Sequence, residues 1–307
     1  VYSGATVGWI PEDDDTVADA PAAPVTQKAI FAYGRNGGSF NMSNLVSSSG
    51  VVAADVSGVG TARGMLGACS YGFDKAIFAY GQTTNISNLV SNSGVVAADT
   101  TGVGTARTNL AASGYGNDKG IFGYGDAGGY TAATNLVSNS GVVATDTSGV
   151  GSARQYLSAC SYGGDKAIFG FGTTGSITAI TNLVSNSGVV SADVTGVGTV
   201  RTSLGSCGYG GDKGIFAYGL NGPAQNMSNL VSNTGVVATD TAGVGTARQD
   251  PAGAGYGGDK GIIAYGYAGG LISISNLVNN VGVIAADVSG VGTVRYLLAA
   301  AGYSNSA

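Results

Sequence analysis

The sequence contains no histidine, and only 10% of its 307 residues are charged, whereas about 25% is usual for a globular protein. Without histidine the chain cannot form a Ser/His/Asp triad or a Cys/His pair, and nearly all zinc and copper sites are excluded. Five prolines and the lack of a triplet period exclude collagen, despite 55 glycines. No run approaches the ~20 apolar residues that a membrane helix needs, so we expect no membrane insertion.

The sequence does contain one unit that is repeated six times. The segment KAIFAYG begins at Lys28 and returns, slightly altered, after steps of 47, 44, 47, 47 and 47 residues. Each copy continues with an Asn-Leu-Val segment, a Gly-Val-Val-like segment with an aspartate, and a Gly-Val-Gly segment that ends in arginine. The copies cover residues 28–303. We therefore assign residues 28–307 to one repeat domain and residues 1–27 to an acidic arm with a Pro/Ala linker.

Each repeat predicts β-strands and no helix. Residues 29–33 are apolar at every position, which is typical of a strand buried on both faces. Residues 45–46 and 51–54 flank a Ser-Ser-Ser-Gly turn, and a strand of small residues follows each repeat arginine. No segment resembles a helix of about ten residues or more. We therefore expect an all-β protein made of four-stranded antiparallel units.

Such units can stack as a β-propeller or as an open solenoid. A repeat of about 45 residues with four strands has the length of one propeller blade. The repeat begins at Lys28 with the second strand of a unit and stops after Tyr303 with a first strand. We expect one split blade, with its outer three strands from residues 28–60 and its inner strand from residues 295–303. This phase predicts a six-bladed β-propeller closed by the split blade, without the open edges of a solenoid.

The order of segments in each repeat carries a family resemblance. An arginine, a strand of small residues, Gly-Gly-Asp-Lys, an Ile-Phe-x-Tyr-Gly strand and two outer strands follow one another, and this order resembles the kelch blade. The chain departs from that family because Gly34 stands alone where the kelch blade has two glycines, and because the outer-strand tryptophan is absent. Near-identical tandem copies are also similar to repeats in tail and appendage proteins of bacterial and marine viruses. That resemblance implies a virion-associated or extracellular setting.

The copies differ mainly in the loop after the second strand and in the two residues after each arginine. In an up-and-down blade these two places lie at the same end, so the differences predict one varied rim. Exposed aromatic residues beside Asn and Thr suit a sugar ring or a partner protein, and drift in exposed loops is the alternative explanation. The candidate binding residues of the rim are Asn36, Phe40, Met65, Asn109, Tyr130, Tyr156, Ile177, Tyr267, Leu271 and Tyr296.

The arm accounts for the whole net charge of −5, because residues 1–27 hold five acidic residues and no basic one. The repeat domain has 13 residues of each sign and no basic patch, which argues against nucleic-acid binding. The arm also holds the only tryptophan, and we expect it to add a strand to a neighbouring subunit; a disordered leader is the alternative. The candidate assembly residues are Val7, Trp9, Ile10, Glu12, Asp13, Asp14 and Asp15.

Each repeat arginine follows an aspartate by eight residues, and we expect buried ion pairs that join neighbouring blades. A ring of arginines that captures an anion at the channel mouth is the alternative. The residues concerned are Asp55, Arg63, Asp99, Arg107, Asp146, Arg154, Asp193, Arg201, Asp240, Arg248, Asp287 and Arg295. The three cysteines occupy equivalent positions in separate copies, so we interpret them as small core residues and predict no metal site and no cofactor.

These features predict a non-enzymatic structural or recognition module, because no cluster of titratable residues interrupts the repeat. We expect it to belong to an extracellular assembly such as a virion appendage or a surface filament. Its partners would be copies of itself or another structural protein, with the arm making subunit contacts. The alternative is a lectin-like propeller that binds glycans as a monomer.

Overall fold

The computed structural model describes residues 26–307, which form strands, isolated bridges and turns but no helix. Accordingly, no helical segment in this range could cross a membrane. The strands form six three-stranded antiparallel sheets, one for each repeat, with the middle strand named second here. The sheets are β20 (Ala299–Tyr303), β1 (Lys28–Ala32) and β4 (Ser43–Val46); β5 (Gly67–Tyr71), β6 (Lys75–Ala79) and β7 (Ser87–Val90); β8 (Ala111–Tyr115), β9 (Lys119–Gly123) and β10 (Thr134–Val137); β11 (Ser158–Tyr162), β12 (Lys166–Gly170) and β13 (Thr181–Val184); β14 (Gly205–Tyr209), β15 (Lys213–Ala217) and β16 (Ser228–Val231); and β17 (Ala252–Tyr256), β18 (Lys260–Tyr267) and β19 (Leu271–Val278). A short hairpin, β2 (Arg35–Asn36) and β3 (Gly38–Ser39), follows β1.

The middle strand of each sheet is buried on both faces, as its apolar sequence predicts. The side chains of β1 after Lys28 are fully buried, and the equivalent strands repeat this pattern. Aromatic rings pack between successive sheets: the ring centroids of Tyr33 and Phe78 lie 5.4 Å apart, as do those of Phe31 and Tyr265. The hydrophobic core therefore consists of six clusters, each of which draws its residues from two neighbouring sheets.

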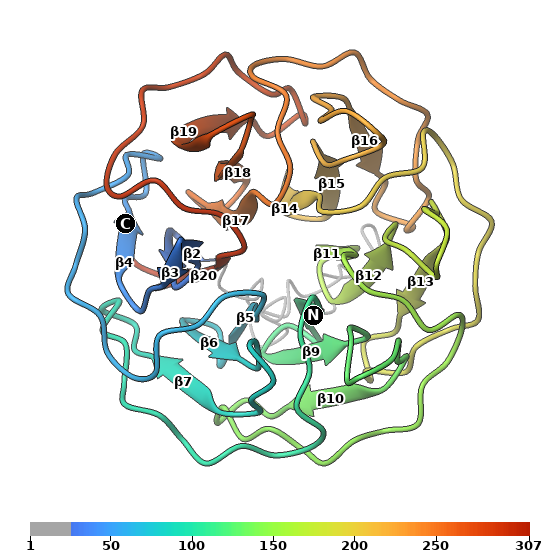
Figure 1. Cartoon of the computed structure of the whole chain (residues 1–307), viewed down its shortest axis with the longest axis horizontal. Helices are drawn as coiled ribbons and strands as arrows, with labels where there is room; N and C mark the ends of the chain where they lie inside the picture. The colour runs from blue at the N-terminus through green and yellow to red at the C-terminus, as the bar shows by residue number, and fades with distance from the viewer. Residues whose placement is uncertain (1–25) are drawn as a thin grey trace, which may run out of the picture.

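The two ends of the repeat domain meet in one sheet. β20 pairs with β1 in an antiparallel register that runs from Lys28 opposite Tyr303 to Ala32 opposite Ala299. The pairing expected between residues 295–303 and the first apolar strand is therefore present. In Figure 1 the six sheets follow one another around a common centre in chain order. The orange-red sheet of β17, β18 and β19 lies beside the sheet that contains the blue strand β4.

The outermost strand expected at residues 51–54 of the first repeat does not form. In the first repeat, its only bridges to β4 are Val52 with Val46 and Val56 with Ser43. The two bridged positions are three residues apart on β4 but four residues apart on the partner segment, so that segment bulges by one residue. The side chain of Asn44 donates to the carbonyl of Ala53 at 2.9 Å inside this bulge and takes the place of a ladder bond. Each sheet consequently has three strands and a bulged outer segment, which runs along the periphery in Figure 1.

Candidate functional site

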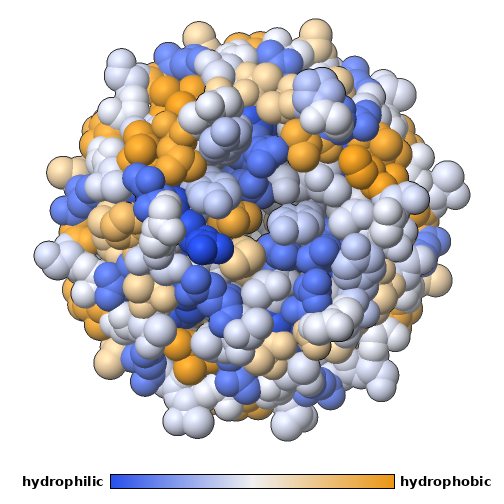
Figure 2. All heavy atoms as spheres, in the orientation of Figure 1, coloured by the Kyte–Doolittle hydropathy of each residue, from blue (hydrophilic) through white to orange (hydrophobic). Residues whose placement is uncertain are grey.

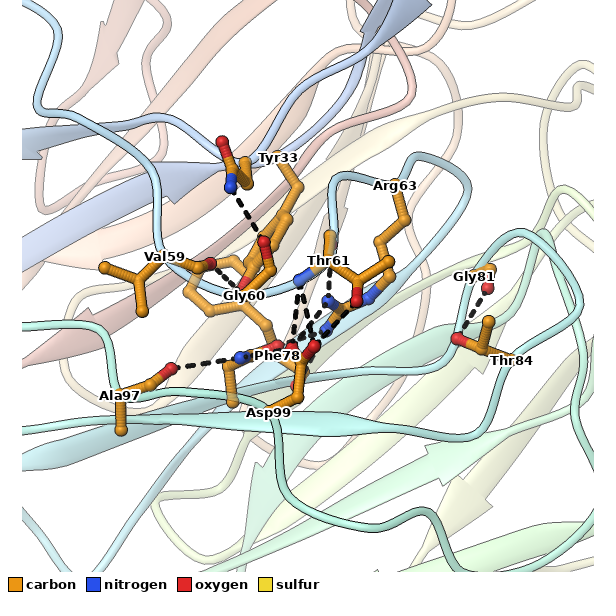
Figure 3. A network of polar contacts seen from close by, with 12 residues as sticks. Tyr33, Val59, Gly60, Thr61, Arg63, Phe78, Gly81, Thr84, Ala97 and Asp99 are labelled. Atoms are coloured by element: carbon orange, nitrogen blue, oxygen red, sulfur yellow. Dashed lines mark hydrogen bonds and ion pairs between the residues drawn. The ribbon is translucent and has the colours of Figure 1, made fainter.

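Each repeat arginine lies in a buried network between two neighbouring sheets, which Figure 3 shows for Arg63. The guanidinium of Arg63 stacks 4.3 Å from the centroid of the Tyr33 ring, which belongs to the sheet of its own repeat. Its Nε donates to the carbonyl of Tyr80 at 2.8 Å, and its Nη2 donates to Oδ1 of Asn88 at 2.7 Å. Because Tyr80 and Asn88 belong to the next sheet, one arginine stacks on its own sheet and donates hydrogen bonds to the following one. We call this network the inter-sheet latch.

An aspartate of the next repeat completes the latch. The carboxylate of Asp99 accepts hydrogen bonds from the backbone N–H of Thr61 at 3.0 Å, from its hydroxyl at 2.6 Å and from Nδ2 of Asn88 at 2.9 Å. The Nη1 atom of Arg63 is farther away, at 4.0 Å. Burial by itself would raise the pKa of Asp99, but the hydrogen bonds from Thr61 and Asn88 and the charge of Arg63 outweigh it and lower the pKa. Asp99 therefore holds the loop before Arg63 mainly through hydrogen bonds.

The same latch joins the last repeat to the first. Arg295 donates to the carbonyl of Tyr33 at 2.9 Å and to Oδ1 of Asn44 at 2.6 Å, and its Nη1 lies 3.8 Å from Asp55. Each arginine thus faces the aspartate of the following repeat rather than the one that precedes it by eight residues. The pairs within 4.0 Å are Arg63–Asp99, Arg107–Asp146 and Arg295–Asp55. In the other three copies the charge of the aspartate raises the pKa of the arginine, against the larger effect of burial. These pairs are Arg154 with Asp193, Arg201 with Asp240 and Arg248 with Asp287.

The six arginines are not available to an anion in solution. All of them are 0% exposed and each stacks on an aromatic ring at 3.8–5.1 Å. Burial lowers the pKa of Arg201 to about 10, which reflects the cost of keeping a charge away from water. This burial excludes an exposed arginine ring at a channel mouth. The latch is a structural element, and a binding site has to be sought among the varied residues.

In five of the six repeats the two varied places lie side by side, as expected. Isolated bridges join Gln249 to Tyr267 and Tyr296 to Arg35, that is, the residue after an arginine to the residue after a Tyr-Gly pair. Three further repeats have the equivalent bridge, and these join Thr108 to Asp126, Gln155 to Thr173 and Thr202 to Leu220. The varied residues therefore share one end of the sheets, which we call the varied rim. Figure 2 shows the face that carries β2 and β3, where hydrophilic residues surround a central hollow.

Three of the candidate rim residues meet in one groove. Tyr267, Leu271 and Tyr296, with Gly37 and Gln249, line a space of about 350 Å³ between the last and the first repeat. The two tyrosine rings have centroids 6.4 Å apart and are inclined by 50°. β18 and β19 are eight residues long here and extend the hairpin to the rim. We call this space the tyrosine groove.

Other candidate rim residues do not reach the tyrosine groove. Asn36 donates to the carbonyl of Val294 at 3.2 Å, and Tyr130 is exposed on the loop of the third repeat. Phe40 and Ile177 are half-buried in the loops of their own repeats. These four residues share the varied rim but form no common site.

Met65, Asn109 and Tyr156 instead lie near the common centre of the six sheets, where they line a cavity of about 120 Å³. All six repeats contribute to its lining, each with the residues that start its inner strand. The equivalent residues of the other repeats are Ser203, Asp250 and Leu297. These three were not candidates from the sequence, although each stands two residues after a repeat arginine, as Met65 does. We call this space the axial cavity.

The remaining expectations concern the arm, the cysteines and metal ions. The candidate assembly residues Val7–Asp15 lie outside the described residues. Cys69, Cys160 and Cys207 are buried and unpaired, and burial raises the pKa of the Cys69 thiol to about 12. Within residues 26–307, no three His, Cys, Asp or Glu side chains are grouped so that they could hold a metal ion.

In comparisons with known proteins, no family model and no curated protein sequence matches this chain.

Proposed function

We propose that the six sheets are the blades of a six-bladed β-propeller, closed by the split first blade, and that the protein is a non-enzymatic recognition and assembly module. Three observations support the closed ring: the pairing of β20 with β1, the Arg295–Asp55 latch across the same junction, and the lining of one axial cavity by all six repeats. The bulged outer segment takes the place of the fourth strand of each blade. The resemblance to viral appendage repeats supports a place in a virion-associated or extracellular assembly.

The binding role rests on the tyrosine groove. At the positions of Tyr296 and Tyr267, the other five repeats have no aromatic residue. The residues there are Gly64, Thr108, Gln155, Thr202 and Gln249 for the first position, and Arg35, Gln82, Asp126, Thr173 and Leu220 for the second. One junction out of six therefore carries a tyrosine pair. Paired tyrosines bury a large apolar area and keep a polar tip, so they are suited to the centre of a protein interface.

A glycan ligand is the second candidate, because a sugar ring can stack on an aromatic face while its hydroxyl groups bond to polar neighbours. The inclined rings of Tyr267 and Tyr296, with Gln249 between the two repeats, offer both kinds of contact. In that case the protein would act as a lectin-like monomer.

A glycan array and an interaction measurement with a candidate structural protein distinguish the two functions. Tyr296→Ala is expected to weaken binding at least tenfold in whichever assay the wild type is active. Tyr130→Ala is the matched control, because Tyr130 is an exposed rim tyrosine outside the groove. Equal loss in both variants, or no loss in Tyr296→Ala, would show that the tyrosine groove is not the binding site.

The acidic arm is proposed to make the contacts between subunits, because it carries the whole net charge of the chain. Deletion of residues 1–25 should then reduce the assembled fraction in light scattering and sedimentation, and added salt should weaken assembly of the full chain. Assembly that is unchanged by the deletion would contradict this role and leave the tyrosine groove as the contact to test next.

A further inference from the structure

The axial cavity has a mouth whose geometry is set by the backbone. The second residue after each arginine has a left-handed conformation, with φ between 53° and 61°. Backbone hydrogen bonds link these residues around the mouth, from Met65 to Leu297, Asn109 to Met65, Tyr156 to Asn109, Ser203 to Tyr156 and Asp250 to Ser203, at 2.9–3.0 Å. Because the backbone holds all six Cβ positions in place, the chemistry of the mouth depends only on which side chains stand there.

Those six side chains divide into two arcs. Asn109, Tyr156, Ser203 and Asp250 are neighbours in the hydrogen-bonded order and form a polar arc. Leu297 and Met65 are also neighbours and form an apolar arc opposite. A ligand in this cavity would therefore meet polar groups on one side and hydrocarbon on the other.

The polar arc is rich in acceptors and has no cation. Among the described residues, Asp250 is the only charged one in the cavity lining, so the lining has no lysine or arginine. Oδ1 of Asn109 is buried without a hydrogen-bond partner, while its Nδ2 donates to Oε1 of Gln155 at 2.9 Å. Burial raises the pKa of Asp250 to about 6, although hydrogen bonds from Ser203 and Gln249 oppose the rise. A half-buried carboxylate whose hydrogen bonds do not offset its burial, and a buried amide oxygen without a partner, are costly unless a ligand supplies a donor.

We propose that the axial cavity binds a primary ammonium group, with Asp250 and Asn109 as its acceptors and Met65 and Leu297 against the attached methylene groups. An ammonium has three donors on one compact charge, which can reach acceptors in three directions. A guanidinium has its donors in one plane and matches a carboxylate edge to edge, which a ring of separate acceptors does not offer. Calcium needs six to eight oxygen ligands and usually several carboxylates, whereas this lining has one.

The size of the cavity agrees with this ligand class. A volume of about 120 Å³ corresponds to roughly four water molecules, enough for an ammonium and a few methylenes. Such a group is found in a free alkylamine and at the tip of a lysine side chain of a partner protein. The site is distinct from the tyrosine groove, although the adjacent residues Gln249 and Asp250 place the two spaces next to each other.

The test measures binding to the full-length protein by NMR and calorimetry at pH 7.5. The probes are methylammonium, butylammonium, tetramethylammonium and a short peptide with one central lysine. We expect butylammonium to bind, with shifts at the amides of Ser203 and Leu297, and to bind at least threefold more tightly than methylammonium. Tetramethylammonium has the same charge but no N–H donor, and it should bind at least tenfold more weakly. Tighter binding of the peptide than of butylammonium would identify a protein lysine as the source, and the reverse would identify a free amine.

Two variants and one control separate the site from general electrostatic attraction. Asp250→Asn keeps the shape of the side chain and should weaken butylammonium binding at least tenfold, and Asn109→Leu should weaken it at least threefold. Asp126→Asn removes the same charge from the same rim outside the cavity lining, and should change binding less than twofold. Equal binding of tetramethylammonium, equal effects of Asp126→Asn and Asp250→Asn, or no binding of any amine would overturn the proposal.

Discussion

The thiol of Cys69 lies so close to Gly120 of the following repeat that a Cβ added at Gly120 would be 2.4 Å from Sγ. Cys160 with Gly214 and Cys207 with Gly261 have the same relationship, at 2.4 and 2.3 Å. In the other three sheets a smaller residue replaces the cysteine, and alanine replaces the glycine of the following sheet. These pairs are Ser113 with Ala167, Ala254 with Ala29 and Ala301 with Ala76. Neighbouring sheets thus exchange side-chain volume, so that the space between them stays filled.

This volume exchange predicts strong coupling between Cys69 and Gly120. Gly120→Ala should destabilise the protein by about 1–3 kcal/mol, because the added methyl group overlaps the thiol in a packed core. In the double variant Cys69→Ala, Gly120→Ala the methyl group has room, and the loss should be smaller than for Gly120→Ala alone. Denaturant unfolding of the four proteins of this cycle gives the coupling energy.

Gly114→Ala is the control for this cycle, because a Cβ at Gly114 would meet no atom closer than 3.7 Å. It should change the free energy of unfolding by no more than about 0.5 kcal/mol. Additive effects in the double variant would mean that the contact between Cys69 and Gly120 does not limit packing.

The latch between the last and first repeats predicts that Arg295 cannot be replaced by another cation. Arg295→Leu leaves the carbonyl of Tyr33 and Oδ1 of Asn44 without their buried donor, which should cost about 3–5 kcal/mol. Arg295→Lys keeps the charge but loses the planar set of donors, so we expect it to recover less than half of this loss. Full recovery in the lysine variant, measured by chemical unfolding, would show that charge alone accounts for the latch.

The pH dependence of stability should have two parts of opposite sign. The six latch aspartates have lowered pKa values in the folded state, so their contribution is present above the unfolded pKa of about 3.9 and is lost as the pH falls below it. Asp250 has a raised pKa of about 6, so its protonated form favours folding, and that contribution is lost as the pH rises from about 4 to 6.

Thermal unfolding at pH values between 3 and 8 checks both parts. The wild type should be most stable near pH 4–5 and should lose up to about 1.4 kcal/mol per pH unit toward pH 6 through Asp250. Asp250→Asn should remove that decline and be the more stable protein at pH 7.5. Identical profiles of the two proteins between pH 4 and 6 would contradict the raised pKa.

Removal of β20 should prevent folding to a monomer. Deletion of residues 298–307 exposes the edge of β1, whose apolar residues then lack the partner strand that runs from Ala299 to Tyr303. We expect oligomers formed by strand exchange, since an exposed apolar edge pairs readily with another chain. Size-exclusion chromatography with light scattering detects them, and deletion of residues 305–307 alone is the control. A folded monomer without β20 would show that the β1–β20 pairing is dispensable.

Much of the fold was predictable because it depends on local patterns. The apolar run at Ala29–Tyr33 indicated a strand buried on both faces, and the phase of the repeat between Lys28 and Tyr303 indicated the pairing of the two ends. The outermost strand, expected at residues 51–54 of the first copy, was predicted wrongly. A bulge depends on which carbonyl the side chain of Asn44 occupies, and the pattern of apolar residues carries no sign of that bond.

The candidate site was only partly predictable. Comparison of the six copies identified Tyr267, Leu271 and Tyr296 as varied, but it did not show that these three line one groove. It assigned Asn109 and Tyr156, which share the repeat position of Asp250, to the rim, whereas the structure places all three in the lining of the axial cavity. Along the chain, each sheet with a cysteine is followed by a sheet in which glycine comes after the first lysine. Only the structure showed that the cysteine and this glycine pack against each other.

The sequence by itself determined the all-β class, the six copies and the order in which they follow one another, because strands, turns and repeats are written in neighbouring residues. Only the tertiary structure decided which residues of different copies come together: Arg63 meets Asp99, Cys69 meets Gly120, and Asn109 and Asp250 line one cavity. Contacts between copies depend on the angle and spacing at which one sheet packs on the next, and that packing is set by the side chains of both sheets together.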